Sequence, residues 1–145
     1  EALRNHPLVS GALESFWVVM KPNLPPPRAP GQPPSLYFEQ YCEMQMRFHK
    51  VLMVYDPKPD GGHPKSGREL NEDLVGLAAK NDWEIDRNPV DVVGRTDEPI
   101  MKKRTWLQAV FNVADAWTAG TAPIEYSVFL DQLFSAITTT GYGCV

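Results

Sequence analysis

The sequence predicts an all-α fold of about five helices. Apolar residues recur at steps of three and four in five stretches, which is the spacing of one face of an α-helix. Segments rich in proline, glycine and other turn residues separate these stretches. No stretch alternates apolar and polar residues between hairpin turns, so we expect no sheet.

A proline-rich segment separates the first two predicted helices. The first helix is expected over residues 8–20, and it ends there because Lys21 precedes a proline and is disfavoured in the helical conformation. Residues 22–34 contain seven prolines, so they can form neither a helix nor a strand ladder. We expect them to be an ordered, extended connection that contacts the domain or a partner, rather than a free tether. A polyproline ligand for an aromatic groove is the alternative interpretation.

Capping residues mark the starts of the second and third predicted helices. The second is expected over residues 35–55, with Ser35 as its N-cap. Ser66 and Glu69 have the spacing of a capping box, which predicts the start of the third helix. The expected buried side chains of these two helices are Tyr37, Tyr41, Met44, Phe48, Leu52, Tyr55, Leu70, Leu74, Leu77, Ala78 and Trp83.

The fourth and fifth predicted helices carry clear apolar stripes. The fourth is expected over residues 101–117, with Gly120 beyond its end as a candidate C-terminal cap. The fifth follows Thr121, tolerates Pro123 in its first turn and ends near residue 137. We expect three aromatic residues of the fourth helix to be core residues rather than partner anchors: Trp106, Phe111 and Trp117.

The helices divide into two halves of one domain. Residues 8–55 form the first helix-loop-helix unit, and residues 67–137 form the second unit with the final helix. A length of 145 residues fits a single domain, which we place at residues 1–137. Residues 138–145 are expected to be a C-terminal tail.

Composition and charge exclude several classes of protein. Hydrophobic residues make up 43% and charged residues 22%, which is typical of a globular domain. The net charge of −4 argues against nucleic-acid binding, and the basic cluster at residues 102–104 is interpreted as a solvated face. No run of eighteen apolar residues occurs, so no membrane span is expected. Cys42 and Cys144 lie far apart in the sequence, which favours a reducing, cytoplasmic compartment. Without an initiator Met or a signal-peptide pattern, we interpret the chain as a piece of a longer protein.

No residue pattern predicts catalysis. The three histidines, His6, His49 and His63, do not have the spacing of metal ligands, and no phosphate-binding glycine pattern is present. The alternating acids Asp82, Glu84 and Asp86 could act in acid–base chemistry only if buried together, and we expect them to be solvated or to cap the next turn. We therefore expect no enzymatic activity, no catalytic residue, no cofactor and no small-molecule substrate.

The loop after the third predicted helix was tested against the calcium loop of an EF-hand. Such a loop needs oxygen ligands at positions 1, 3 and 5, Gly at 6 and Glu at 12. With Asp86 at position 1 and Asn88 at 3, position 5 is Val90, position 6 is Asp91 and position 12 is Asp97. Three requirements fail, and the loop over residues 21–34 contains no acid at all. We expect no metal site. Only weak candidates remain if calcium binds: Asp86, Asn88 and Asp91.

Several blocks resemble the degenerate, calmodulin-like EF-hand domains of ciliary and flagellar axonemal proteins. Residues 81–86 form an acid-Trp-acid block, residues 106–118 contain Phe-x-x-Ala-Asp-x-Trp-Thr, and residues 124–134 contain Glu-Tyr-x-x-Phe-Leu-x-x-Leu-Phe. Residues 6–9 and 35–41 resemble the entry of the same domain. The departures are the proline-rich first loop and the insertion at residues 57–65.

The resemblance implies a structural component of the ciliary or flagellar axoneme, with protein partners and possible association with microtubules. The residue pattern favours the same class of function as the resemblance, because strongly patterned helices beside acid-poor loops favour an adaptor that holds a partner helix or strand. Two alternatives stay open. One is a weak calcium sensor using Asp86, Asn88 and Asp91, and the other is a subunit of a mitochondrial or ribosomal complex.

Overall fold

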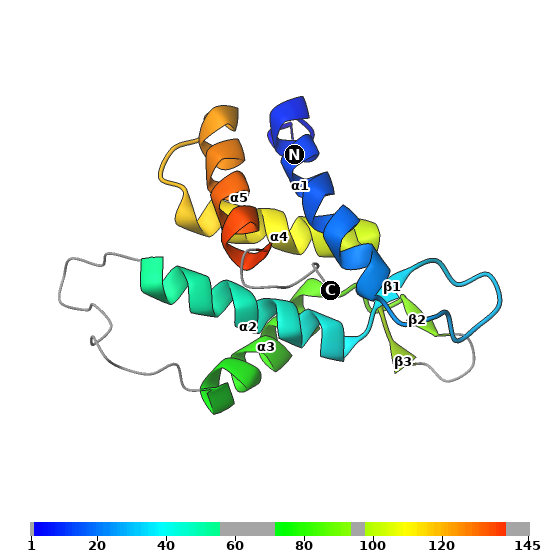
Figure 1. Ribbon diagram of the computed structural model, residues 1–145. Helices are drawn as coiled ribbons and strands as arrows, with labels where there is room; N and C mark the ends of the chain where they lie inside the picture. The colour runs from blue at the N-terminus through cyan, green and yellow to red at the C-terminus, as the bar shows by residue number, and fades with distance from the viewer. Residues whose placement is uncertain (1, 56–71, 94–97, 139–145) are drawn as a thin grey trace.

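The computed structural model describes residues 2–55, 72–93 and 98–138, and these residues are mostly helical (Figure 1). The prediction of a mostly helical chain is confirmed. The α-helices in these ranges are α1 (Pro7–Met20), α2 (Phe38–Tyr55), α3 (Glu72–Asp86), α4 (Lys103–Trp117) and α5 (Pro123–Thr138). A short 3₁₀ helix, η1 (Lys21–Asn23), follows α1. The predicted capping box at Ser66 and Glu69 lies outside the described residues, as does nearly all of the predicted tail.

The helices form two packed groups around one core. α1 packs along α5, α2 packs along α3, and α4 crosses beneath α1 and α5 (Figure 1). Phe16 of α1 joins the groups, because its ring meets Phe48 of α2 edge-on at 6.2 Å and Phe134 of α5 at 5.4 Å between centroids. α5 also contacts α2 and α4, so it covers apolar surface contributed by both halves of the chain.

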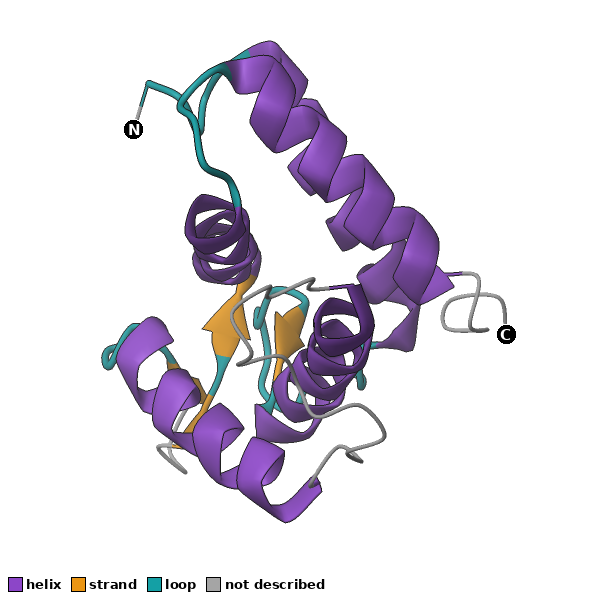
Figure 2. Cartoon of the chain, turned by 90° about the vertical axis from the view of Figure 1, so that its left-hand side faces the viewer, coloured by secondary structure: helices purple, strands orange, loops and turns teal. Residues whose placement is uncertain are grey.

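The expectation that no sheet forms is wrong in detail. β1 (Ser35–Leu36) pairs antiparallel with β4 (Met101–Lys102), and β2 (Val92–Val93) pairs antiparallel with β3 (Glu98–Pro99). These short pairs lie between the helices (Figure 2). Two-residue strands are too short to show an alternating pattern, so the sequence carried no signal for them. The β1–β4 pair ties the segment before α2 to the segment before α4.

The second helix begins later than predicted. Ser35 lies in β1 instead of capping a helix, and its hydroxyl donates to the carbonyl oxygen of Pro33 at 2.8 Å. α2 starts at Phe38, where the side-chain oxygen of Gln40 accepts the backbone N–H of Tyr37 at 2.8 Å. This is the back-reaching half of a capping box, with Gln at the third helical position. The fourth helix is likewise shortened at its start, because Met101 belongs to β4.

The proline-rich segment contacts the domain, as expected, but it is not extended throughout. It begins with η1 and turns back at residues 29–32, where Gly31 has φ of 76° and Gln32 N–H bonds the Ala29 carbonyl. A positive φ of this kind costs glycine little, so the turn forms easily there. The Arg28 guanidinium lies 3.9 Å from the Tyr37 ring centroid and bonds the Glu98 carboxylate at 2.7 Å.

We predict that trypsin cleaves slowly after Arg28 in the intact chain. Trypsin can cut there because Ala29 follows, but the arginine must first leave Glu98. Glu98→Gln is expected to accelerate this cleavage about two- to fivefold, in keeping with an exposed ion pair worth roughly 0.2–1 kcal/mol. Timed proteolysis with mass spectrometry measures the rate, with cleavage after Lys80 as the internal reference. Rapid cleavage at Arg28 in the assembled complex would refute the idea of a held segment.

Candidate functional site

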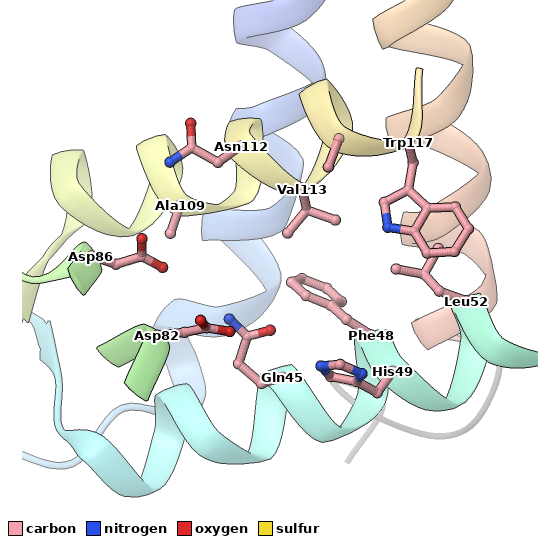
Figure 3. Close-up of a pocket in the computed structure, with 11 residues that line it drawn as sticks. Gln45, Phe48, His49, Leu52, Asp82, Asp86, Ala109, Asn112, Val113 and Trp117 are labelled. Atoms are coloured by element: carbon pink, nitrogen blue, oxygen red, sulfur yellow. The ribbon is translucent and has the colours of Figure 1, made fainter. Parts of the chain in front are cut away.

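A cavity of about 300 Å³ opens between α2, α3 and α4 (Figure 3). Its wall is mostly apolar, with the carboxylates of Asp82 and Asp86 at the α3 end and His49 beside Phe48 on α2 (Figure 3). The lining residues are Gln45, Phe48, His49, Leu52, Asp82, Asp86, Ala109, Asn112, Val113, Ala116 and Trp117. Neither the cavity nor its acidic end was predicted from the sequence.

Trp117 was predicted to be a core residue, and this is wrong. Trp117 is 42% exposed, although Trp106 and Phe111 on the same helix are buried as expected. Trp117 is the last residue of α4, and its indole faces the cavity opposite α2 (Figure 3). A large exposed aromatic beside an apolar hollow is typical of an interaction anchor.

Two further cavities adjoin the first. One, of about 410 Å³, follows the turn from α4 to α5 and shares Trp117 with the first cavity. The other, of about 60 Å³, lies between α2 and α5 and shares Leu52 with the first. Both contain Phe129. We call these three cavities, which share Trp117, Leu52 and Phe129 among their lining residues, the groove.

Other expectations about α3 and α4 need correction. Leu77 was placed in the buried stripe of the third helix but is 66% exposed. Gly120 was a candidate helix cap, yet within the described residues only Gly31 has a positive φ. α4 ends at Trp117, and the residue after it, Thr118, is extended and donates its hydroxyl to the Ala114 carbonyl at 2.6 Å.

Two carboxylates mark the α3 end of the groove. Asp82 and Asp86 are one helical turn apart on α3, and both line the first cavity (Figure 3). The Tyr41 hydroxyl donates to Asp86 Oδ2 at 2.8 Å. Burial raises the pKa of Asp86 above its ordinary value, the Tyr41 hydrogen bond lowers it, and the negative charge of Asp82 raises it. The expectation that these acids are simply solvated is therefore wrong for Asp86.

We predict that Asp86→Asn stabilises the chain at neutral pH. Because the folded pKa of Asp86 is raised, the folded state holds its proton to higher pH than the unfolded state. The ionised carboxylate therefore costs stability, and this cost develops as the pH rises from the unfolded pKa through the folded one. Asparagine removes the cost, and its carbonyl oxygen can still accept the Tyr41 hydroxyl.

Thermal melts of the wild type and Asp86→Asn at pH 7 and near pH 4 measure the effect. The variant is expected to melt higher at pH 7, with a smaller difference at the lower pH. A variant that melts below the wild type at pH 7 would contradict the assignment.

The three weak calcium candidates do not converge. Asp86 accepts the Tyr41 hydroxyl, Asn88 Oδ1 accepts the backbone N–H of Val90 at 3.3 Å, and Asp91 pairs with Lys102 at 3.4 Å. Asp97, the twelfth loop position, lies outside the described residues. In the part of the chain that the structure describes, no three His, Cys, Asp or Glu side chains are grouped to hold a metal ion.

Basic side chains of the protein itself pair with acids of the second loop. Arg28 bonds Glu98 from the proline-rich segment, and Lys102 bonds Asp91 across the loop. Lys103, in the cluster that was interpreted as a solvated face, pairs with Glu14 of α1 at 3.1 Å. These three ion pairs join different segments of the chain.

We predict that calcium does not bind in the sensor range. Val90 offers no side-chain oxygen, and Lys102 already neutralises Asp91. Isothermal titration of the 145-residue chain is expected to show no site with a dissociation constant of about 10⁻⁷–10⁻⁵ M. A saturable site in that range, lost in Asp91→Asn, would overturn the prediction.

The structure describes two of the three histidines, His6 and His49. His6 Nδ1 accepts the backbone N–H of Leu8 and so caps the start of α1. His49 lines the first cavity beside Phe48. His63 lies outside the described residues.

The remaining comparisons concern the membrane and known proteins. Among the described helices, none combines the length and hydropathy of a membrane span. No family model matches this sequence, and searches of curated proteins and of solved structures found no match.

Proposed function

We propose that this chain is a non-catalytic adaptor whose groove holds a segment of a protein partner in a large assembly. The observation that carries the proposal is the mostly apolar groove, in which the exposed Trp117 lines two of the three cavities. An exposed tryptophan beside an apolar hollow is typical of an interaction anchor. Helical walls favour a helical occupant, because an amphipathic helix can place its apolar face between them.

The adaptor is proposed to be a pair of degenerate EF-hand-like units. In this proposal α1 and α2, consecutive in the chain, are the helices of one helix-loop-helix unit, and α3 and α4 are those of the other. β1 and β4 support the pairing, because each lies just before the second helix of its unit and they bond to one another. The ion pair from Arg28 to Glu98 links the two loops in addition. The units would thus be held together without calcium.

The proposed location is the cytoplasmic axoneme of a cilium or flagellum, among microtubule-associated proteins. This part rests on the resemblance of residues 81–86, 106–118 and 124–134 to axonemal EF-hand-like domains. A subunit of a mitochondrial or ribosomal complex is the alternative that the location experiment separates. No nucleic-acid, membrane or small-molecule partner is proposed.

The test expresses the tagged full-length protein in ciliated cells and extracts the axonemes with detergent. The proposal expects the wild type to remain with the axonemes and Trp117→Glu to be released. Val18→Glu is the matched control, because Val18 is exposed on α1 and does not line the groove. A protein recovered with mitochondria or ribosomes would refute the location, and equal retention of Trp117→Glu and wild type would refute the role of the groove.

A further inference from the structure

We propose that the occupant of the groove is a basic amphipathic helix, with a lysine or arginine that pairs with Asp82 and Asp86. This inference rests on the proposed function, because it names the chemistry of the partner that the groove holds. It is carried by the distribution of charge over the groove, the position of the two carboxylates and the apolar anchor at the opposite end.

The charged side chains of the groove are acidic. Asp82 and Asp86 line the first cavity and Glu125 lines the cavity along the α4–α5 turn, whereas none of the described lysines and arginines lines any of the three. The basic residues Arg47 and Lys50 of α2 line a further cavity of about 490 Å³, which shares Val51 with the cavity between α2 and α5 but no residue with the first cavity. The α3 end of the first cavity therefore favours a positively charged side chain of a partner.

The two carboxylates at the α3 end have capacity for a cation. Within the described ranges, Asp82 has no hydrogen-bond or ion-pair partner, and Asp86 has only the neutral hydroxyl of Tyr41. Side chains four residues apart on a helix are neighbours, so one ammonium or guanidinium group can contact both acids. Such a cation would offset the burial and the mutual repulsion that disfavour the charge on Asp86.

The apolar anchor lies at the other end of the first cavity. Along α4 the lining runs from Ala109, beside Asp86, to Trp117 (Figure 3). Eight residues of helix span about 12 Å, which is about two turns. A helix lying along the groove would therefore carry its basic residue about two turns from its main apolar side chain, with further apolar residues at steps of three and four.

The experiment uses two labelled synthetic peptides and the 145-residue chain. Both peptides carry the same apolar face, and they differ only in having two lysines or two glutamates about two turns from the main anchor. Fluorescence anisotropy measures their affinities. The lysine peptide is expected to bind at least about tenfold tighter, and added salt is expected to weaken its binding.

The variant Asp82→Asn/Asp86→Asn is expected to reduce the difference between the peptides to about twofold or less. Glu84→Gln is the matched control, because Glu84 lies on the same helix, pairs with Arg87 and does not line the groove. Thermal melting confirms that each variant is folded, and Glu84→Gln is expected to keep the full preference for lysine.

The other outcomes separate the inference from the function on which it rests. If both peptides bind equally and Trp117→Ala abolishes this binding, the pairing of a cation with Asp82 and Asp86 is refuted. The proposal that the groove binds a partner is then retained. A lysine preference that survives the double variant would also refute the pairing. Binding of neither peptide would refute both proposals. The chain could instead form a dimer that Trp117→Ala dissociates. That result would show that the groove binds a second copy of the chain, and it would contradict the proposal of a basic partner helix.

Discussion

Replacing Phe111 with alanine is expected to lower the free energy of unfolding by about 3–5 kcal/mol. The Phe111 ring is only 9% exposed and stacks on Tyr126 of α5, with 5.4 Å between centroids and 15° between planes. Tyr126 in turn donates its hydroxyl to Asp115 on α4. Alanine would leave a cavity between α4 and α5 and remove the aromatic stack, so both the packing and the α4–α5 contact weaken.

Chemical denaturation of the 145-residue chain measures this loss. The midpoint of thermal unfolding should fall by about 10 °C, at the roughly 2–4 °C per kcal/mol typical of a domain this size. Asn112→Ala, at the exposed neighbouring position, is the control and should change stability by less than about 1 kcal/mol. An unchanged melting temperature together with lost partner binding would show that Phe111 belongs to the interface and not to the core.

Trp117→Ala is expected to have the opposite effects, which are a small loss of stability and a large loss of peptide binding. Trp117 is 42% exposed at the end of α4, so the loss of its indole should cost no more than about 1 kcal/mol of stability. The same side chain lines two of the three cavities of the groove. Its truncation should weaken binding of the lysine peptide by about thirtyfold or more, which corresponds to the roughly 2 kcal/mol of an interface hot spot.

Anisotropy titrations of Trp117→Ala and of Ile85→Ala check this expectation. Ile85 is also an exposed apolar residue, but it lies outside the groove lining, so its variant should bind as the wild type does. Wild-type affinity in Trp117→Ala would show that the indole is not an anchor. A large loss of stability in Trp117→Ala would show that Trp117 is a core residue.

The helices could be predicted from the sequence because their signals are local. Apolar spacing placed α1, α4 and α5 within a few residues of their observed bounds, and Pro123 lies in the first turn of α5 as expected. The starts of α2 and α4 were displaced because residues 35–36 and 101–102 pair with each other across the chain. Pairing between segments so far apart in sequence leaves no trace in a helical pattern.

Trp117 shows why the groove could not be predicted. It follows Trp106 by eleven residues, which returns it to within about 20° of the same helix face. Periodicity therefore assigned both residues to one buried stripe. Burial, however, depends on what covers each end of that stripe, and at Trp117 the surfaces of α2 and α5 leave a hollow. That depends on the arrangement of three helices and not on the pattern of one.

The acidic end of the groove had a weak signal in the sequence. Asp82 and Asp86 have the spacing of neighbours on a helix face, and Trp83 between them is buried. The spacing predicts that the two acids lie together but not what faces them. Tyr41, whose hydroxyl contacts Asp86, lies 45 residues away in the chain and was itself assigned only to an apolar stripe.

The most direct test of the adaptor function is an NMR titration that follows the four tryptophan indole N–H signals as the lysine peptide is added. Trp17 and Trp106 are buried and pack against each other away from the groove lining, whereas Trp117 lines it. The proposed function predicts that the Trp117 signal shifts most, that Trp17 and Trp106 shift least, and that saturation follows the affinity measured by anisotropy. Peptide binding that leaves the Trp117 signal in place, or no binding at all, would contradict a partner helix held in this groove.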